Sequence, residues 1–321
     1  MPNIKKPVSY LISAVLLISP VIAYWQRQNI YDWYRLRGYE APAEIASLAD
    51  QTTMVGYARK VFYVARPELQ DKSDFSKNCT IVEKTIVLGC YRSGLGIFVY
   101  NVSDARLNGV LQVTSAHEML HAAYERLSNK ERLRVDTMTA EAYASITDER
   151  IKKNVESYRA RDAAVVPNEL HSILGTEVRE LPAELETYYK KYFTDRSKIV
   201  GYSEQYEAEF TKREDAVAAY DHQLKDLKSK ITSLNDSLAT QGASIEAENA
   251  RLESLAAARK IGEYNAAIPN YQNMINAYNA DVSALKSAIE QYNGIVDARN
   301  AIVTEEQELI NAIDSSVPAS K

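Results

Sequence analysis

The chain has 321 residues, which is enough for one sizeable folded core and an additional extended element. Its 38 basic and 43 acidic residues nearly balance, which argues against a nucleic-acid-binding protein. Glycine and proline are scarce, at 11 and 9 residues, and tyrosine is abundant at 22. This composition is typical of a helix-rich protein without long disordered regions.

An uncharged apolar run from Val8 to Trp25 follows two lysines near the N-terminus. As a helix, its eighteen residues would rise about 27 Å, which just suffices to cross a typical hydrocarbon core. We therefore expect a membrane-spanning helix within residues 1–25 and a single-pass protein whose remaining chain is extracytoplasmic. The stretch Val21-Ile22-Ala23 also resembles a signal-peptide cleavage site, so secretion after cleavage is the alternative.

Residues 26–200 predict a mixed domain, with a short sheet near its start and helices after it. Ala41-Pro42-Ala43-Glu44 is typical of a helix start. The β-branched and aromatic runs Lys60–Val64 and Gly96–Val102 predict strands. From Thr114 onward the strand signals end and helical patterns follow.

Cys79 and Cys90, the two cysteines of the chain, lie eleven residues apart. The residues between them, Thr80–Val82 and Thr85–Leu88, resemble two short strands around a turn, which would place the cysteines at the ends of a hairpin. Two free buried thiols are the alternative, but an even pair in an exported chain favours a bridge. We therefore predict a Cys79–Cys90 disulfide.

The stretch "TSAHEMLHAAYERL", residues 114–127, contains the pattern His-Glu-x-x-His. On a helix, His117 and His121 lie one turn apart on the same side, so both imidazoles can reach one zinc ion. Glu118 can then contact a water on that zinc and act as general base. The alternative is an amphipathic helix that has the pattern by chance. We expect the helix to begin at Thr114 or Ser115, either of which can cap it.

A zinc site also needs a third protein ligand, and three later glutamates are candidates. Glu141 lies twenty residues after His121, and Glu169 lies forty-eight after it. Glu177 lies eight residues beyond Glu169, about 12 Å further along a helix, so only one of that pair could bind.

His117–His121 together with Asn168-Glu169-Leu170-His171-Ser172 resembles the gluzincin group of zinc metallopeptidases. The resemblance implies that Glu169 is the third zinc ligand, with Glu141 as the alternative. The thermolysin-like branch of this group has an aspartate after the serine, where this chain has Ile173. We interpret His171 as a polar packing residue, with stabilisation of the reaction intermediate as an alternative if Glu141 is the ligand.

Residues 201–316 change character and show apolar residues at alternating spacings of three and four, from Val217 to Leu255 and again from Ile275 to Ile313. Such heptads predict long helices packed along a seam. Gly262 and Pro269 predict a break between two helices of similar length, which should fold back antiparallel. We expect a coiled-coil hairpin, followed by a flexible tail over residues 317–321.

The predicted fold is therefore α+β and mostly helical, with an N-terminal membrane helix, a small zincin-like domain at residues 26–200 and the coiled-coil hairpin. The predicted function is that of a membrane-anchored zinc (Zn²⁺) metallopeptidase acting on a polypeptide substrate, with the hairpin recruiting a protein partner or holding the domain away from the surface. The alternative is a non-enzymatic cell-envelope adaptor that acts through its coiled coil. Glu118 favours the enzyme, since a purely structural zinc site has no use for a carboxylate beside an open position.

Overall fold

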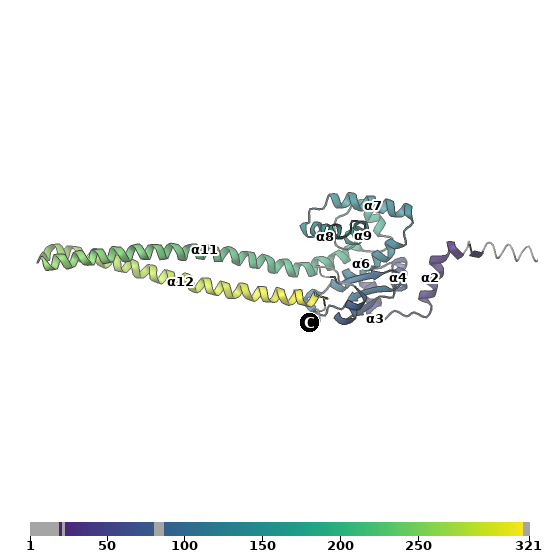
Figure 1. Ribbon diagram of the computed structural model, residues 1–321, viewed down its shortest axis with the longest axis horizontal. Coiled ribbons are helices and arrows are strands. Elements are labelled where there is room, and N and C mark those ends of the chain that lie inside the picture. Colours follow the sequence, from purple (N-terminus) through teal and green to yellow (C-terminus); the bar gives the residue numbers. More distant parts are fainter. Residues whose placement is uncertain (1–18, 21–22, 80–86, 317–321) are drawn as a thin grey trace, which may run out of the picture. The chain divides into compact units, whose positions relative to one another are not determined.

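The computed structural model describes residues 19–20, 23–79 and 87–316 of the chain. The chain forms two compact units, one of Met1–Glu207 with Asn311–Lys321 and the other of Ala208–Ile310. The described residues are mostly helical, with a small sheet in the first unit and two long C-terminal helices (Figure 1). The predicted tail at residues 317–321 lies outside the described residues.

The first unit begins with three helices, α2 (Arg27–Leu36), α3 (Ala43–Gln51) and α4 (Gly56–Val64). Helix α3 follows Pro42, as the sequence predicts. The strand predicted at Lys60–Val64 is wrong, because these residues form the second half of α4. Ala58, Val61 and Phe62 are buried at helical spacing, so the burial of one helix face outweighs the strand preference of the β-branched residues.

The predicted membrane-spanning helix is not supported. Most of that segment, residues 1–18 and 21–22, lies outside the described residues. Among the helices that are described, none combines the length and the apolar character needed to cross a membrane. The first complete one, α2, has ten residues and includes Arg27, Asp32 and Arg35. The prediction of a single-pass membrane protein, which rested on that helix, is therefore wrong.

Three strands form the sheet of the described residues in the order β1-β3-β2. The central strand β3 (Gly96–Tyr100) pairs in parallel with β1 (Glu68–Gln70) and antiparallel with β2 (Gly89–Arg92). Strand β3 confirms the prediction for this stretch but ends two residues earlier than expected. The turn between β2 and β3 contains Gly94 at φ +74°, a backbone conformation that glycine adopts at little cost. Because β3 lies between the other two strands, β2 forms one outer edge of the sheet.

The predicted Cys79–Cys90 disulfide is confirmed. Cys79 does not end a strand, since it terminates helix α5 (Lys72–Asn78), while Cys90 lies in the edge strand β2. The predicted strand Thr80–Val82 lies outside the described residues, and Val87 and Leu88 precede β2. The disulfide thus joins a helix end to the edge strand instead of closing a regular hairpin.

The rest of the first unit consists of helices around α6 (Val110–Glu125). Helix α6 packs against α9 (Val166–Thr176) and also contacts α3, α4, β2 and β3. The short helix η1 (Ala105–Leu107) leads into α6, and α7 (Asn129–Ala144), α8 (Glu149–Arg161) and α10 (Ala183–Tyr189) complete the unit. The core joins these elements through buried residues such as Phe62, Ile97, Leu120 and Ile173.

The second unit consists of the parts of α11 (Arg196–Ala257) and α12 (Ile261–Ile313) that lie within Ala208–Ile310. Helix α11 begins in the first unit, and α12 ends in it. Within the second unit the two helices are antiparallel and lie side by side (Figure 1). Three pairs show this: Arg213 with Glu305, Asp221 with Arg299, and Gln241 with Asp281.

The turn between these helices differs from the prediction. The chain reverses at Ala258–Lys260, where Arg259 has φ +55°, so the turn precedes both residues expected to break the helix. Gly262 is the second residue of α12, and Pro269 lies within the same helix.

Candidate metal centre

Helix α6 carries the His-Glu-x-x-His pattern in its middle. It does not begin at Thr114 or Ser115, as predicted, but at Val110, after Gly109. Gly109 has φ +110°, and a Cβ there would lie 2.5 Å from the carbonyl oxygen of Tyr202. Only glycine satisfies both conditions, and this close approach fixes the start of the helix two turns before the histidines.

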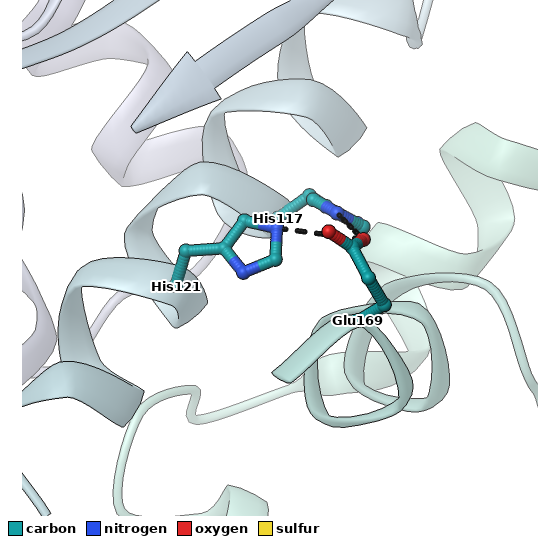
Figure 2. Close-up of side chains that lie close together, drawn as sticks. All are labelled: His117, His121 and Glu169. Carbon is teal, nitrogen blue, oxygen red and sulfur yellow. Dashed lines mark ion pairs between the residues drawn. The ribbon is translucent and has the colours of Figure 1, made fainter. Parts of the chain in front are cut away.

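His117 and His121 project from the same side of α6 toward Glu169 of α9 (Figure 2). The Glu169 Oε2 atom lies 3.6 Å from His117 Nε2 and 3.7 Å from His121 Nε2. One ligand atom from each of the three side chains lies within 4.8 Å of the others. This group could hold a metal ion.

Glu169 lies in the first turn of α9, near Pro167, and α9 packs along α6. Burial alone would raise the pKa of Glu169, but the imidazoles of His121 and His117 lower it below its usual value. The Oε2 atom is buried and has no hydrogen-bond partner. An ionised, buried oxygen without a hydrogen bond is costly, and a cation between it and the two imidazoles would lower that cost. The residues present therefore fit a metal.

The other two candidate glutamates are not part of this group, although Glu177 lines the same pocket. Glu141 is exposed on α7. Glu177 follows α9 and accepts a hydrogen bond from Arg150 at 2.7 Å. Of the three candidates, only Glu169 lies with the histidine pair.

Glu118 lies beside the histidines and is 5% exposed. Burial raises the pKa of Glu118 to about 7. The nearby imidazole of His121 and a hydrogen bond with the backbone of Tyr91 act in the opposite direction and lower this pKa. A Cβ built on Gly89 would lie 2.9 Å from Glu118 Oε1 and 2.5 Å from a methyl group of Thr114. The backbone of the edge strand therefore lies directly against the Glu118 carboxyl, and glycine permits this approach.

A pocket of about 580 Å³ contains the His117, His121 and Glu169 side chains together with Glu118. Strand β2 and the preceding residues Val87 and Leu88 line one part of it, and α8 and α9 line another. Four residues of α8 line it at spacings of four, four and three: Arg150, Asn154, Tyr158 and Arg161. These spacings place all four on one face of the helix.

The outer edge of β2 is open among the described residues, since β3 pairs with its other side. The Leu88 carbonyl accepts a hydrogen bond from the Tyr100 amide at 2.9 Å, so Leu88 directs its backbone toward β3. Adjacent residues in an antiparallel strand direct their polar groups to opposite sides. Gly89 and Tyr91 therefore direct their backbone polar groups toward the open edge. This direction agrees with the hydrogen bond between the Tyr91 backbone and the Glu118 carboxyl.

Ser172 is a site residue to which the sequence alone assigned no role. Its Oγ atom lies 3.3 Å from His121 Nδ1, and the residue is fully buried. A partner on one ring nitrogen selects which nitrogen is free to face a metal, here Nε2. Ile173, at the position of the missing aspartate, is buried in the core instead. The sequence could have indicated this role, because Ser172 lies three residues after Glu169. One helical turn therefore places both side chains on the same side of α9.

We expect Ser172→Ala to lower the zinc affinity of the protein by about 10–100-fold while leaving the fold intact. The alanine removes the hydroxyl that orients His121 without creating a large cavity. Competition with a chromogenic zinc chelator measures the affinity. Ser157→Ala, on the exposed side of α8, is the matched control, since its hydroxyl donates a hydrogen bond to the Asn154 carbonyl of the same helix. Equal zinc affinities for the two variants would contradict a role for Ser172.

His171 is not part of the ligand group and packs in the core, which agrees with its interpretation as a polar packing residue. It is fully buried, its Nε2 lies 2.9 Å from the Tyr188 hydroxyl, and burial lowers its pKa to about 3. The Tyr188 hydroxyl in turn lies 2.9 Å from that of Tyr192. His171 is therefore a neutral core residue that joins α9 to α10 and the residues after it.

Comparison with known proteins returned no matching family model, no matching curated protein and no matching solved structure. A His–His–Glu cluster is common and does not by itself identify a gluzincin. The resemblance to that group thus depends on the two short motifs alone.

Proposed function

We propose that this protein is a zinc metallopeptidase that hydrolyses peptide bonds within the pocket of the first unit. The observation that carries the proposal is the buried Glu169 Oε2, which makes no hydrogen bond and lies 3.6 and 3.7 Å from the Nε2 atoms of His117 and His121. Two imidazoles and one carboxylate match the three protein ligands of many catalytic zinc sites, which leave a fourth position open. Glu118, buried beside this group, supplies the carboxylate that a purely structural site does not need.

Zinc held by His117, His121 and Glu169 would supply Lewis-acid chemistry, acidifying a water and polarising the carbonyl that is attacked. Glu118 accepts the proton of the attacking water and later gives it to the leaving amine. The pKa of about 7 that burial gives Glu118 suits both directions of transfer near neutral pH. One carboxyl group thus serves as base and then as acid.

The open edge of β2 supports a polypeptide as the substrate. An extended chain can add to this edge and pair with the backbone of Gly89 and with the Tyr91 carbonyl. Such pairing recognises main chain rather than side chains, and it places the substrate backbone next to Glu118, which Gly89 approaches closely. A folded substrate would have to present an extended segment.

We assign to Tyr158 the stabilisation of the oxygen of the attacked carbonyl. Its phenol lines the pocket, and burial raises its pKa, with the Glu169 and Glu118 carboxylates adding to the rise. The pocket that Tyr158 lines also contains the side chains of Glu118 and Glu169. Because the phenol stays protonated, it can donate a hydrogen bond to a developing negative charge.

We expect Tyr158→Phe to lower kcat by about 10²–10³-fold with zinc content unchanged, since loss of one oxyanion donor has that effect in other enzymes. The phenyl ring keeps the packing of α8 against the pocket. Steady-state kinetics and metal analysis of the same preparation measure both quantities. Tyr143→Phe on α7 provides a control whose ring does not line the pocket. A kcat within twofold of the parent chain would exclude Tyr158 from this role.

The proposed function is tested by incubating the full chain, loaded with one equivalent of zinc, with unstructured polypeptides such as denatured casein. Mass spectrometry should show new termini produced by hydrolysis, and a chelator should prevent their formation. Intact substrates in the presence of stoichiometrically bound zinc would contradict the proposal and favour a non-enzymatic protein.

A further inference from the structure

Helix α2 has an inverted distribution of side chains. The one buried residue of the helix is Asp32, while its aromatic residues face solvent. Trp33 is 62% exposed and Trp25, just before the helix, is 82% exposed; Tyr24, Ile30 and Tyr34 are exposed as well. A helix on the surface of a soluble domain normally buries its apolar face. These exposed side chains therefore need another explanation than packing within the domain.

The polar side of α2 is held firmly against the rest of the unit. Asp32 forms ion pairs with Lys60 at 2.9 Å and with Arg126 at 3.0 Å. Arg35 donates hydrogen bonds to the carbonyls of Val64 and Leu95 at 3.0 and 3.1 Å. These contacts fix the rotation of the helix, so its aromatic side is directed outward by the fold.

The charges on the outward side are all positive. Between Tyr24 and Gly38 the sequence has one acidic residue, the buried Asp32. The Arg27 guanidinium lies 4.6 Å from the centre of the Tyr24 ring, and that of Arg37 lies 5.5 Å from the Trp33 ring. Tryptophan, tyrosine and arginine together are the side chains favoured where lipid tails meet head groups.

We propose that the face formed by Trp25, Ile30, Trp33 and Tyr34, with Arg27 and Arg37, binds the surface of an anionic lipid bilayer. The helix lies in the interface, with its aromatic rings among the upper acyl chains and its arginines on lipid phosphates. Its ten residues are too few to cross the bilayer, and binding needs no crossing. This inference does not depend on the proposed peptidase activity.

The two tryptophans of the chain both lie on this face, so intrinsic fluorescence reports on it directly. In the full chain with Trp25→Phe, Trp33 is the sole reporter. Vesicles of phosphatidylglycerol and phosphatidylcholine should shift its emission to the blue, and brominated acyl chains should quench it. Vesicles of phosphatidylcholine alone should give a weaker response. Because the apolar run Val8–Trp25 can itself associate with lipid, co-flotation alone does not count as support.

In the Trp25→Phe background, Tyr34→Ser should weaken vesicle binding, read from the Trp33 emission, by about tenfold, and Arg37→Gln by about fivefold. The control in the same background is Leu133→Ser on α7, whose side chain is 70% exposed like that of Tyr34, and it should leave vesicle binding unchanged. Trp33 emission that stays unshifted with anionic vesicles would overturn the proposal. So would emission already shifted to the blue without lipid, since the face would then be covered by this chain or by a second copy.

Discussion

Replacing Glu118 by glutamine is expected to abolish peptide hydrolysis while zinc stays bound. The amide keeps the size of the carboxyl and its place beneath Gly89, but it cannot accept the proton of the attacking water. Loss of a general base lowers rates by about 10²–10⁴-fold. Measurement of kcat/KM and of zinc per chain in one preparation separates the loss of chemistry from the loss of the metal.

Glu141→Gln is the matched control for this variant. Glu141 is a glutamate of the same unit that is exposed on α7 and absent from the pocket. Its substitution should leave both kcat/KM and zinc content unchanged. Hydrolysis that persists within tenfold in Glu118→Gln would show that another group removes the proton, and Glu118 would not be the general base.

Glu169→Ala is expected to remove zinc and activity together. The substitution deletes the only oxygen ligand of the group and leaves His117 and His121, two donors on one helix, to hold the ion. The loss of zinc affinity should exceed the roughly 10–100-fold caused by removing a partner of a ligand, such as Ser172. Isothermal titration of the metal-free protein with zinc measures this affinity.

Glu177→Ala controls for the loss of a carboxylate near the same helix. Glu177 follows α9 and pairs with Arg150 instead of the histidines. The variant should lose some stability but keep its zinc affinity, because its carboxylate is not part of the ligand group. Zinc binding by Glu169→Ala as tight as that of the parent chain would mean that the ion binds at other residues.

The features that could be predicted correctly depend mostly on local patterns of the sequence. His117 and His121 could be paired because one helical turn relates them whatever the fold. The Cys79–Cys90 disulfide follows from the chemistry of an even pair, although Cys79 ends a helix and not a strand. Glu169 came from its short motif, and its position beside the histidines depends on the packing of α9 against α6.

The features that were missed depend on tertiary contacts. Lys60–Val64 has strand-forming residues, but the buried face of α4 makes it helical. The face of α8 that contains Tyr158 shows regular spacing in the sequence, yet only the fold shows that it lines the metal pocket.

The N-terminal apolar run predicted a membrane helix from composition alone, and no described helix supports it.

Similarly, the reversal between α11 and α12 occurs at Arg259 and not at the residues with the strongest helix-breaking propensity. Pro269 lies inside α12, where the long helix tolerates it. Propensity is thus outweighed by the pairing of the two helices, which sets where the turn must fall.

The most direct test of the central claim is a zinc titration of the metal-free full chain, in which bound zinc and cleavage of an unstructured polypeptide are followed together. Hydrolysis should rise in proportion to the first equivalent of zinc and reach a plateau at one ion per chain. Binding of that equivalent without cleavage, or cleavage that is independent of zinc, would contradict the assignment of a zinc metallopeptidase.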